Sequence, residues 1–489
     1  MDHRLKTLRA VAAVALAALA LAPSALASSL ETAVIQYPQS AFEGEDADTS
    51  FALVRDAGAG VVKLFVEWSR VAPTRPATPA DPAAPEYNWT SFDNRVTLAH
   101  RYRLEPLVMI GRAPLWASPG DGWARPDPDE LALFAQAAAT RYSGRFPAPA
   151  APGGVLPRVR YWQVWNEPNL LAYLAPQYER GRLVSADRYR TMVNRFSAAV
   201  KGVDPANRVL AGGTGPFRRI ENSAPLTFMR RFLCLRPNLT RIRGCGPVEF
   251  DIWGHHPYTS GGPLHTAVSP NDVSLGDLPA MRRVLRAAVR RGTIRSSAVA
   301  FWVDEFSWDT RPPDPGGIPP ALHARWTAEA LYRMWRAGVT LVAWFQLVDY
   351  PYTGRCGNPF QSGLYYYAGN VANARAKHSL AAFRFPLVAF RKRGGRVFVW
   401  GRTPQSQPGR VVVEAKVGRR WRRLGTLRTS GGGIFSRRYR RAPSATAVRA
   451  RFGASRSLSF SLKPVRDRFY NPFGVRGLGC SPRIADRTP

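Results

Sequence analysis

Residues 161–168 read Tyr-Trp-Gln-Val-Trp-Asn-Glu-Pro, and they decide how the rest of the chain is interpreted. The apolar run is typical of a buried strand, and it ends abruptly in Asn166, Glu167 and Pro168. Pro168 stops the strand because proline donates no hydrogen bond to a neighbouring strand. The stretch therefore predicts a strand whose C-terminal tip carries an amide and a carboxylic acid beside an aromatic wall.

Seven further strand-like runs alternate with amphipathic helix-like runs, which is typical of an α/β fold with a parallel sheet. The clearest helix spans residues 277–291, where apolar side chains share one face and arginines lie opposite. We expect Asp277 to cap its start and Gly292 its end. The eight predicted strands are residues 33–37, 61–66, 104–110, 159–165, 208–212, 250–254, 299–305 and 341–347.

Eight strand-then-helix units fit a closed (β/α)8 TIM barrel, in which the chemistry lies on loops that follow the strands' C-termini. An open doubly wound sheet is the alternative. It requires a Gly-rich turn after an early strand, whereas residues 38–40 read Pro-Gln-Ser. The sequence also lacks a P-loop, a His-Glu-x-x-His motif and a Gly-x-Ser-x-Gly motif. We therefore predict the TIM barrel.

The chain divides into four predicted parts. Lys6 and Arg9 precede an apolar stretch and the small-residue cleavage signal at residues 25–27, so residues 1–27 are predicted to be a signal peptide and the protein to be secreted. An uncleaved anchor is the alternative, although the apolar run is short for a bilayer crossing. Residues 28–390 are the predicted barrel, residues 391–464 a small basic β-sandwich-like domain, and residues 465–489 a basic tail.

Positive charge is concentrated at the C-terminal end. The net charge is +35, and residues 391–489 hold 25 Lys and Arg against three acidic residues. Such a field attracts anionic surfaces, so the C-terminal domain predicts an anionic cell-envelope polymer as a partner; arginines that are merely solvated are the alternative. Predicted export and the lack of a recognisable reader motif argue against nucleic acid. We expect a monomer.

Four cysteines fall in the predicted mature chain, an even number that is typical of disulfides in an exported protein. Cys234 and Cys245 form the natural local pair. Cys356 would then pair with Cys480 and tie the tail to the large domain. Four metal-binding thiolates are the alternative, but no Cys-x-x-Cys spacing exists.

A second acid ends the seventh predicted strand, where the chain reads Val303-Asp304-Glu305-Phe306. Because side chains alternate along a strand, Asp304 and Glu305 cannot both face the barrel mouth, and we select Glu305. Acids from the fourth and seventh strands approach each other across the mouth. A pair about 5 to 5.5 Å apart is what double-displacement glycoside hydrolysis requires. Glu167 and Glu305 are therefore the predicted catalytic pair.

Residues 165–168 on the fourth strand, with Glu305 on the seventh, resemble clan A, the clan of retaining glycoside hydrolases that includes families 5 and 39. The resemblance spans about residues 30 to 390. It implies that Glu167 is the acid/base, that Glu305 is the nucleophile and that Asn166 binds the sugar 2-hydroxyl. It also implies chemistry without a metal or a cofactor.

Shorter motifs add to the resemblance. His256-Pro257-Tyr258 resembles the clan's His-x-Tyr, which implies that Tyr258 holds the nucleophile and that His256 lines the sugar subsite. Lys63 stands where many members carry arginine on the second strand. Lysine keeps the positive charge but loses the bidentate fork of a guanidinium.

Three tryptophans are predicted to bind substrate. Trp344 resembles the clan's sugar platform, and Trp116 lies in a Pro-x-Trp-Ala turn similar to that of family 39. Trp308 follows Glu305 closely. Plain core packing is the alternative for each of them.

The resulting prediction is a secreted retaining β-glycoside hydrolase acting on a polysaccharide or oligosaccharide. A catalytically inactive carbohydrate-binding or envelope-associated barrel is the alternative, against which two buried carboxylates argue because their desolvation is costly. Barrel loops set the sugar and the linkage. Glu67, Arg112 and Asp349 are the charged candidates for lining that cleft.

Overall fold

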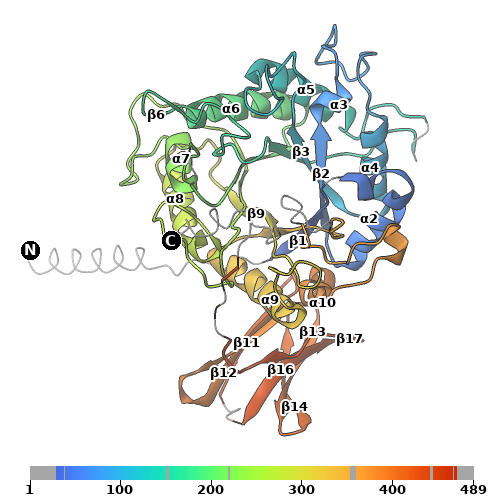
Figure 1. The fold of residues 1–489 in the computed structure, drawn as a ribbon, viewed down its shortest axis with the longest axis vertical. Coiled ribbons are helices and arrows are strands. Elements are labelled where there is room, and N and C mark those ends of the chain that lie inside the picture. Colours follow the sequence, from blue (N-terminus) through green and yellow to red (C-terminus); the bar gives the residue numbers. More distant parts are fainter. Residues whose placement is uncertain are drawn as a thin grey trace, which may run out of the picture.

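Eight parallel strands form a closed ring in the computed structural model, which describes residues 29–37, 39–149, 153–218, 221–352, 360–440, 444–465, 467 and 469–470. The ring follows chain order, with the last barrel strand paired to the first (Figure 1). The predicted (β/α)8 barrel and its eight strands are therefore confirmed. The strands are β1 (Glu31–Ile35), β2 (Val61–Glu67), β3 (Glu105–Gly111), β4 (Tyr161–Val164), β7 (Arg208–Thr214), β8 (Ile252–His255), β9 (Ala300–Phe306) and β10 (Leu341–Phe345).

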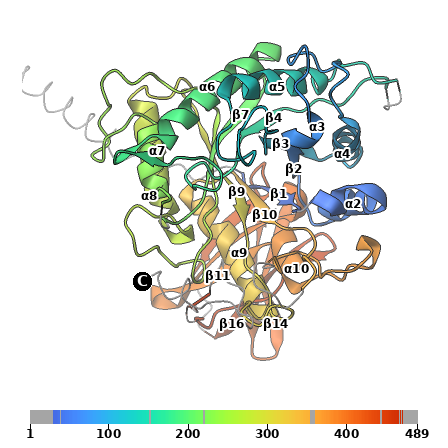
Figure 2. The ribbon, with the colours of Figure 1, turned by 45° about the horizontal axis from the view of Figure 1, so that its top comes forward.

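Helices surround this ring, as Figures 1 and 2 show from two directions. Alternate strand residues such as Ala33, Leu107 and Ala343 fill the barrel interior, while their neighbours pack outward under the helices. A hairpin of β5 (Tyr178–Glu179) and β6 (Arg182–Leu183) follows β4. The helices are α2 (Ala47–Asp56), α3 (Trp68–Val71), α4 (Thr90–Arg101), α5 (Pro128–Arg141), α6 (Ser185–Val203), α7 (Pro225–Phe232), α8 (Leu278–Arg290), α9 (Pro320–Ala337) and α10 (His378–Arg384).

Helix α8 coincides with the helix predicted over residues 277–291. Gly292 ends it with a φ of 63°, as expected for a helix-terminating glycine. Asp277 behaves differently. Its carboxylate accepts hydrogen bonds from Ser274 and from the backbone of Ala267, so it caps the turn before α8 rather than α8 itself.

The chain after the barrel forms two antiparallel sheets, of order β11-β12-β15 and β14-β13-β16-β17, with β18 paired to β16. Val399, Val413 and Val448 are fully buried within them. The first strand begins at Leu387, slightly before the predicted boundary. The strands are β11 (Leu387–Lys392), β12 (Arg396–Arg402), β13 (Arg410–Val417), β14 (Arg420–Arg428), β15 (Ile434–Tyr439), β16 (Ala445–Phe452), β17 (Ser455–Arg456) and β18 (Phe460–Ser461).

These sheets pack on α9 and reach the base of the barrel. The Tyr332 ring of α9 lies 5.3 Å from that of Trp400 and 5.7 Å from that of Phe398. Arg402, fully buried on β12, donates to the carbonyl of Leu30 and to Thr32 Oγ1, each at 3.1 Å. The C-terminal sheets are therefore fastened to the first strand of the barrel.

The predicted disulfide between Cys234 and Cys245 is present. Cys356 and Cys480, the predicted signal peptide and residues 471–489 of the tail lie outside the described residues. None of the helices in the described part is both long and apolar enough to cross a bilayer.

Candidate active site

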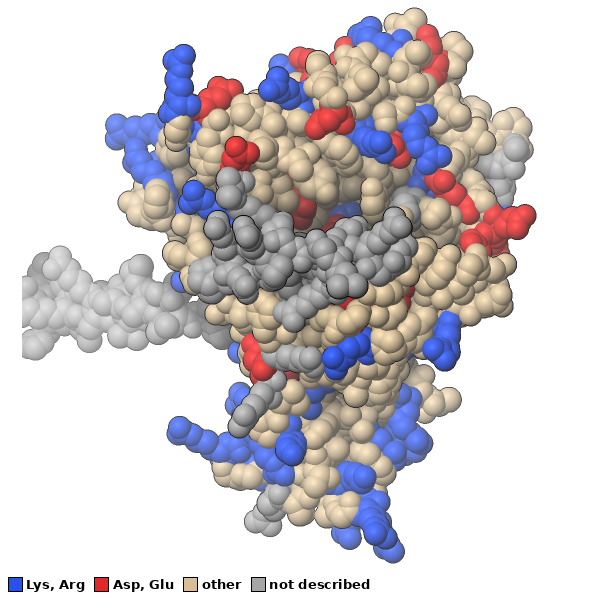
Figure 3. Space-filling view, in the orientation of Figure 1, with Lys and Arg blue, Asp and Glu red and all other residues tan. Residues whose placement is uncertain are grey.

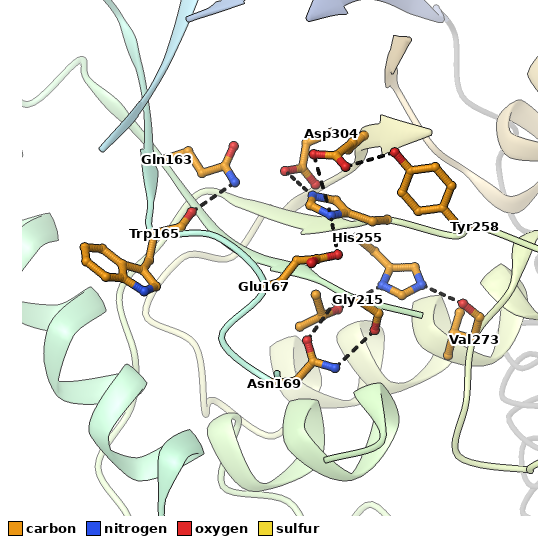
Figure 4. Close-up of polar contacts among 12 residues, drawn as sticks. Gln163, Trp165, Glu167, Asn169, Gly215, His255, Tyr258, Val273 and Asp304 are labelled. Carbon is orange, nitrogen blue, oxygen red and sulfur yellow. Dashed lines mark hydrogen bonds and ion pairs between the residues drawn. The ribbon is translucent and has the colours of Figure 1, made fainter. Parts of the chain in front are cut away.

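Glu167 is delivered by an unusual turn directly after β4. Trp165 and Glu167 have φ values of 64° and 37°, a left-handed conformation that is costly for side chains of this size. The Glu167 amide donates to the Gly213 carbonyl at 3.0 Å. Asn169 ties the following loop to Gly215 through hydrogen bonds of 2.8 and 3.1 Å (Figure 4). These contacts fix the carboxylate at the barrel mouth.

Glu305 reaches the mouth because β9 contains a bulge. Val303 lies opposite Val342, but Phe306 lies opposite Trp344, so β9 has one more residue than β10 over this interval. A bulge of this kind re-aims the side chains around it. Asp304 consequently points into the barrel while Glu305 also turns inward above it. Side chains therefore do not alternate strictly at this position, contrary to the premise from which Glu305 was selected, although Glu305 is the one of the two acids that lines the cavity.

One imidazole joins the three acids. His256 Nδ1 lies 3.0 Å from Glu167 Oε1 and Nε2 lies 3.1 Å from Asp304 Oδ2. The same Nδ1 lies 3.9 Å from Glu305 Oε2. Since distances of 3.0 and 3.9 Å meet at one atom, the oxygens of Glu167 and Glu305 are at most about 7 Å apart. In Figure 4, dashed contacts run from Glu167 and Asp304 to the His256 ring, and the Tyr258 hydroxyl points toward the Glu305 carboxylate.

Buried charges hold His256 in its protonated form. Burial lowers the pKa of His256, but Glu305, Asp304 and Glu167 outweigh that effect and raise it to about 10. The imidazolium therefore donates from both nitrogens. Its neighbour His255 differs, because burial lowers the pKa of His255 to about 3 and its ring is occupied by Thr214 and the Val273 carbonyl.

Lys63 and Asp304 form a buried ion pair beneath the two glutamates. Lys63 Nζ donates to Asp304 Oδ2 at 3.0 Å and to the Asp304 carbonyl at 3.1 Å, with both side chains almost fully buried. Burial raises the pKa of Asp304, but Lys63 and His256 reverse this effect and hold it well below its usual range. Lys63 thus faces the aspartate rather than supporting a glutamate directly.

Tyr258 contacts Glu305, as predicted for the His-x-Tyr tyrosine, and donates its hydroxyl to Oε1 at 2.9 Å. Burial raises the pKa of Glu305. His256, Lys63 and the Tyr258 hydroxyl oppose that rise, and the charge of Glu167 adds to it. Burial and the charge of Glu167 therefore outweigh the groups that favour the Glu305 anion, and the pKa of Glu305 lies above its usual range.

Both glutamates line a cavity of about 190 Å³ at the barrel mouth. Asn166 also lines it, and its Oδ1 atom is buried with no hydrogen-bond partner within the described residues, while the side chain shares a hydrogen bond with Tyr173. An acceptor in this position suits a ligand hydroxyl. The walls are otherwise mostly aromatic, formed by Tyr37, Phe65, Trp123, Tyr173, Phe345 and Phe360.

A search against protein-family models and a search of curated proteins found no match. Among solved structures, the chain is similar to a GH39 enzyme from Xanthomonas axonopodis pv. citri, with 16% identity over 86% of this chain and 93% of that chain and a TM-score of 0.48. A monomeric beta-xylosidase from Caulobacter crescentus CB15 has 15% identity over 85% and 95%, with a TM-score of 0.48. A glucosidase from Croceicoccus marinus has 14% identity over 86% and 95%, also with a TM-score of 0.48.

The three predicted substrate tryptophans lie elsewhere. Trp344 belongs to β10 but is buried on the outer side of the barrel, where it donates to the Ser362 carbonyl and packs against Phe306. Trp308 is buried and donates to the Gly261 carbonyl. Trp116 donates to the Ala72 carbonyl and meets Trp68 edge to face. None of the three lines the cavity around the glutamates, so these predictions were wrong.

Sequence reasoning missed the residues that form the walls. Phe345 could have been found from alternation, because Leu341 and Ala343 also face the barrel interior, which leaves Trp344 on the outer side. Trp123 and Tyr173 come from loops, and no periodic pattern points to them. Asp349, another predicted cleft residue, instead binds Lys377 at 2.6 Å in the interior.

A second cavity of about 560 Å³ lies beside the first, and Tyr37, Phe65 and Trp123 line both of them. The predicted cleft residues Glu67 and Arg112 line this second cavity and form an ion pair there. The site therefore combines a small aromatic cavity holding the two glutamates with a larger, charged extension.

We predict that His256 makes stability depend on pH above neutrality. Its pKa in the folded protein is about 10 against an ordinary value of 6.5, so its contribution is complete below pH 6.5 and is lost as the pH rises toward 10. Urea unfolding should show a loss of a few kcal/mol over this window. The His256→Gln variant should lack that loss, and equal pH dependence in both proteins would contradict the assignment.

Proposed function

We propose that this protein is a retaining β-glycoside hydrolase that cleaves an oligosaccharide or polysaccharide by double displacement. The observation that carries the proposal is the pair Glu167 and Glu305, both within 4 Å of one imidazole nitrogen at the base of an aromatic cavity. The carboxylate oxygens of the two glutamates are at most about 7 Å apart. This limit includes the separation of about 5 to 5.5 Å found in retaining enzymes and excludes most of the range of about 6.5 to 9.5 Å found in inverting enzymes.

In the first step, a Glu305 oxygen attacks the anomeric carbon and forms an ester bond to the sugar. The bond to the leaving oxygen breaks, and that oxygen takes the proton of Glu167. In the second step, Glu167 removes a proton from water, the water oxygen bonds to the anomeric carbon, and Glu305 is released. The stereochemistry at that carbon is therefore inverted twice and retained.

The buried charges suit this cycle. Lys63 and His256 supply two positive charges, and Asp304 and Glu305 supply two negative charges. The set is neutral when Glu167 carries the catalytic proton, which is the form that the first step requires. Asp304 acts as a positioning residue because it touches His256 and Lys63 and does not line the cavity, whereas Lys63 both binds Asp304 and lines the cavity.

Asn166 and the aromatic walls are proposed to bind the sugar. The Oδ1 of Asn166, which has no hydrogen-bond partner in the part of the chain that the structure describes, can accept a hydrogen bond from the 2-hydroxyl, an interaction that strengthens as the transition state forms. The aromatic faces of Trp123 and Phe345 suit the flat C–H surfaces of a pyranose ring. Export, as predicted from residues 1–27, is part of the proposal.

Replacing Glu167 by alanine should separate the two chemical steps. Aryl glycosides with good leaving groups need no proton, so they should still form the covalent intermediate, whereas its hydrolysis should slow by about 100-fold or more. Stopped-flow release of the aryl group should show a burst followed by a slow phase. A uniform loss on substrates with good and poor leaving groups would contradict the acid/base role.

Replacing Arg112 by alanine should test whether the larger cavity binds further sugar units. Loss of a hydrogen bond from a charged group is expected to raise KM for oligosaccharides about tenfold. KM for an aryl monoglycoside, which fills only the smaller cavity, should not change. Arg283→Ala on α8 serves as a matched exposed control. Equal effects of Arg112→Ala on both substrates would argue against a second sugar subsite.

A further inference from the structure

One face of the sheet β14-β13-β16-β17 carries seven cations and one acid. Val411, Val413 and Ala415 of β13 are fully buried, so the residues between them point to solvent. The strand pairing extends this alternation to the neighbouring strands, because directly opposite residues share a face. We call this surface the basic face. Its charged members are Arg410, Glu414, Lys416, Arg423, Arg428, Arg449, Arg451 and Arg456.

Most of these cations have no acidic partner. Glu414 accepts a hydrogen bond from Arg449 at 2.7 Å and lies 3.5 Å from Arg451. Within the described part of the chain, no acidic side chain pairs with the other five cations. Figure 3 shows the same imbalance, with lysine and arginine side chains spread over the C-terminal sheets and little acidic surface among them.

Like charges also lie directly opposite each other across strands. Arg410 is paired with Arg428, and Arg451 is paired with Arg456. Such pairs are destabilising in a sheet. A bound polyanion would reduce this repulsion. Binding should therefore stabilise this surface more than it would stabilise a surface of scattered, solvated arginines.

We propose that the basic face binds an anionic polysaccharide and so holds the active site near this polymer. The choice of a polysaccharide as the ligand rests on the proposed glycosidase function. Guanidinium groups bind carboxylates in a bidentate manner. Strands lie about 4.8 Å apart and alternate residues about 6.8 Å apart, so the face presents charge in regular rows. A polymer with a carboxylate on each sugar offers a matching row.

Other polyanions fit this surface less well. Membrane insertion needs exposed apolar side chains, and none of the large exposed hydrophobic residues of the described chain, such as Leu115 or Leu264, lies on the basic face. Single-stranded nucleic acid is bound by stacking bases on open aromatic rings. The ring of Trp421, the aromatic residue on this face, is covered by the Arg449 guanidinium at 4.1 Å.

The test is a binding measurement on the full chain carrying Glu305→Ala, so that polymer is not consumed and the result does not depend on turnover. Isothermal titration at low ionic strength should show binding of polygalacturonate that weakens as salt is added. Fully methyl-esterified polygalacturonate, which has lost its charges, should not bind. Reversal of Arg410, Arg423 and Arg456 to glutamate should weaken binding about tenfold or more.

A matched control separates the basic face from net charge. The exposed residues Arg236, Arg283 and Arg290 lie on the barrel, and their reversal to glutamate changes the net charge equally. That variant should bind polygalacturonate within about twofold of the parent. Equal weakening by both triple variants, or no binding by the parent, would overturn the proposal. So would tighter binding of duplex DNA or phosphatidylglycerol vesicles through the same residues. Thermal unfolding verifies that each variant is folded.

Discussion

Glu305→Ala is expected to reduce kcat/KM by about 10⁵-fold, because the covalent intermediate can no longer form. Azide should restore part of the turnover, since it is small enough to occupy the space of the missing carboxylate and attack the anomeric carbon from the same side. The product should be an α-glycosyl azide, which proton NMR identifies from its anomeric coupling. The same substitution at Glu179, an exposed residue of the β5–β6 hairpin, should have no effect on turnover.

The outcome discriminates between mechanisms. Rescue by azide with formation of the β-glycosyl azide would assign Glu305 to a role other than nucleophile. Unchanged activity of Glu305→Ala would remove the proposed reaction altogether. If Glu305→Ala is inactive, is not rescued by azide and is also unfolded, the isosteric Glu305→Gln variant replaces it. Loss of activity in a folded Glu305→Gln variant would then support the role of Glu305.

Asp304→Ala is expected to lower the free energy of unfolding by about 3 to 5 kcal/mol, because it leaves Lys63 and the His256 imidazolium buried with no charge between them. Activity should fall as well, since His256 loses the partner that fixes its orientation. Urea unfolding at neutral pH measures the first effect. Asp304→Asn keeps the shape and isolates the contribution of the charge.

A double-mutant cycle tests whether the pair acts as a unit. Lys63→Met alone should be destabilising for the same reason as Asp304→Ala. The double variant Lys63→Met with Asp304→Leu should cost clearly less than the sum of the single changes, because no buried charge of that pair remains uncompensated. Additive losses would show that the two side chains do not depend on each other.

The barrel was predictable from sequence because it depends on local patterns. Each strand is an apolar run of the right length, and the helix over residues 277–291 shows its buried face directly in the spacing of its apolar residues. Cys234 and Cys245 were equally accessible, because short separation favours pairing. The residues on the strands were therefore placed correctly to within a few positions.

The cavity was less predictable because its geometry depends on departures from regular structure. The bulge in β9 that turns Glu305 inward arises from the pairing of β9 with β10, and no residue pattern in the sequence predicts it. The tryptophan chosen for the cavity, Trp344, lies on the outer side of its strand. Trp123 and Tyr173 belong to loops whose paths are set by packing against the rest of the protein. The hydrophobic periodicity of the sequence does not predict such paths.

Arg402 also determines what happens when the protein is divided. A fragment ending before β11 would lack Arg402, whose guanidinium donates a hydrogen bond to the carbonyl of Leu30. It would also expose the Tyr332 and Trp335 rings of α9 that pack against Trp400. Uncovered aromatic rings of this kind promote aggregation. The contacts of Arg402, Tyr332 and Trp335 therefore make the barrel depend on the C-terminal sheets for stability, and replacing the sheets by another domain would require the same contacts to be rebuilt.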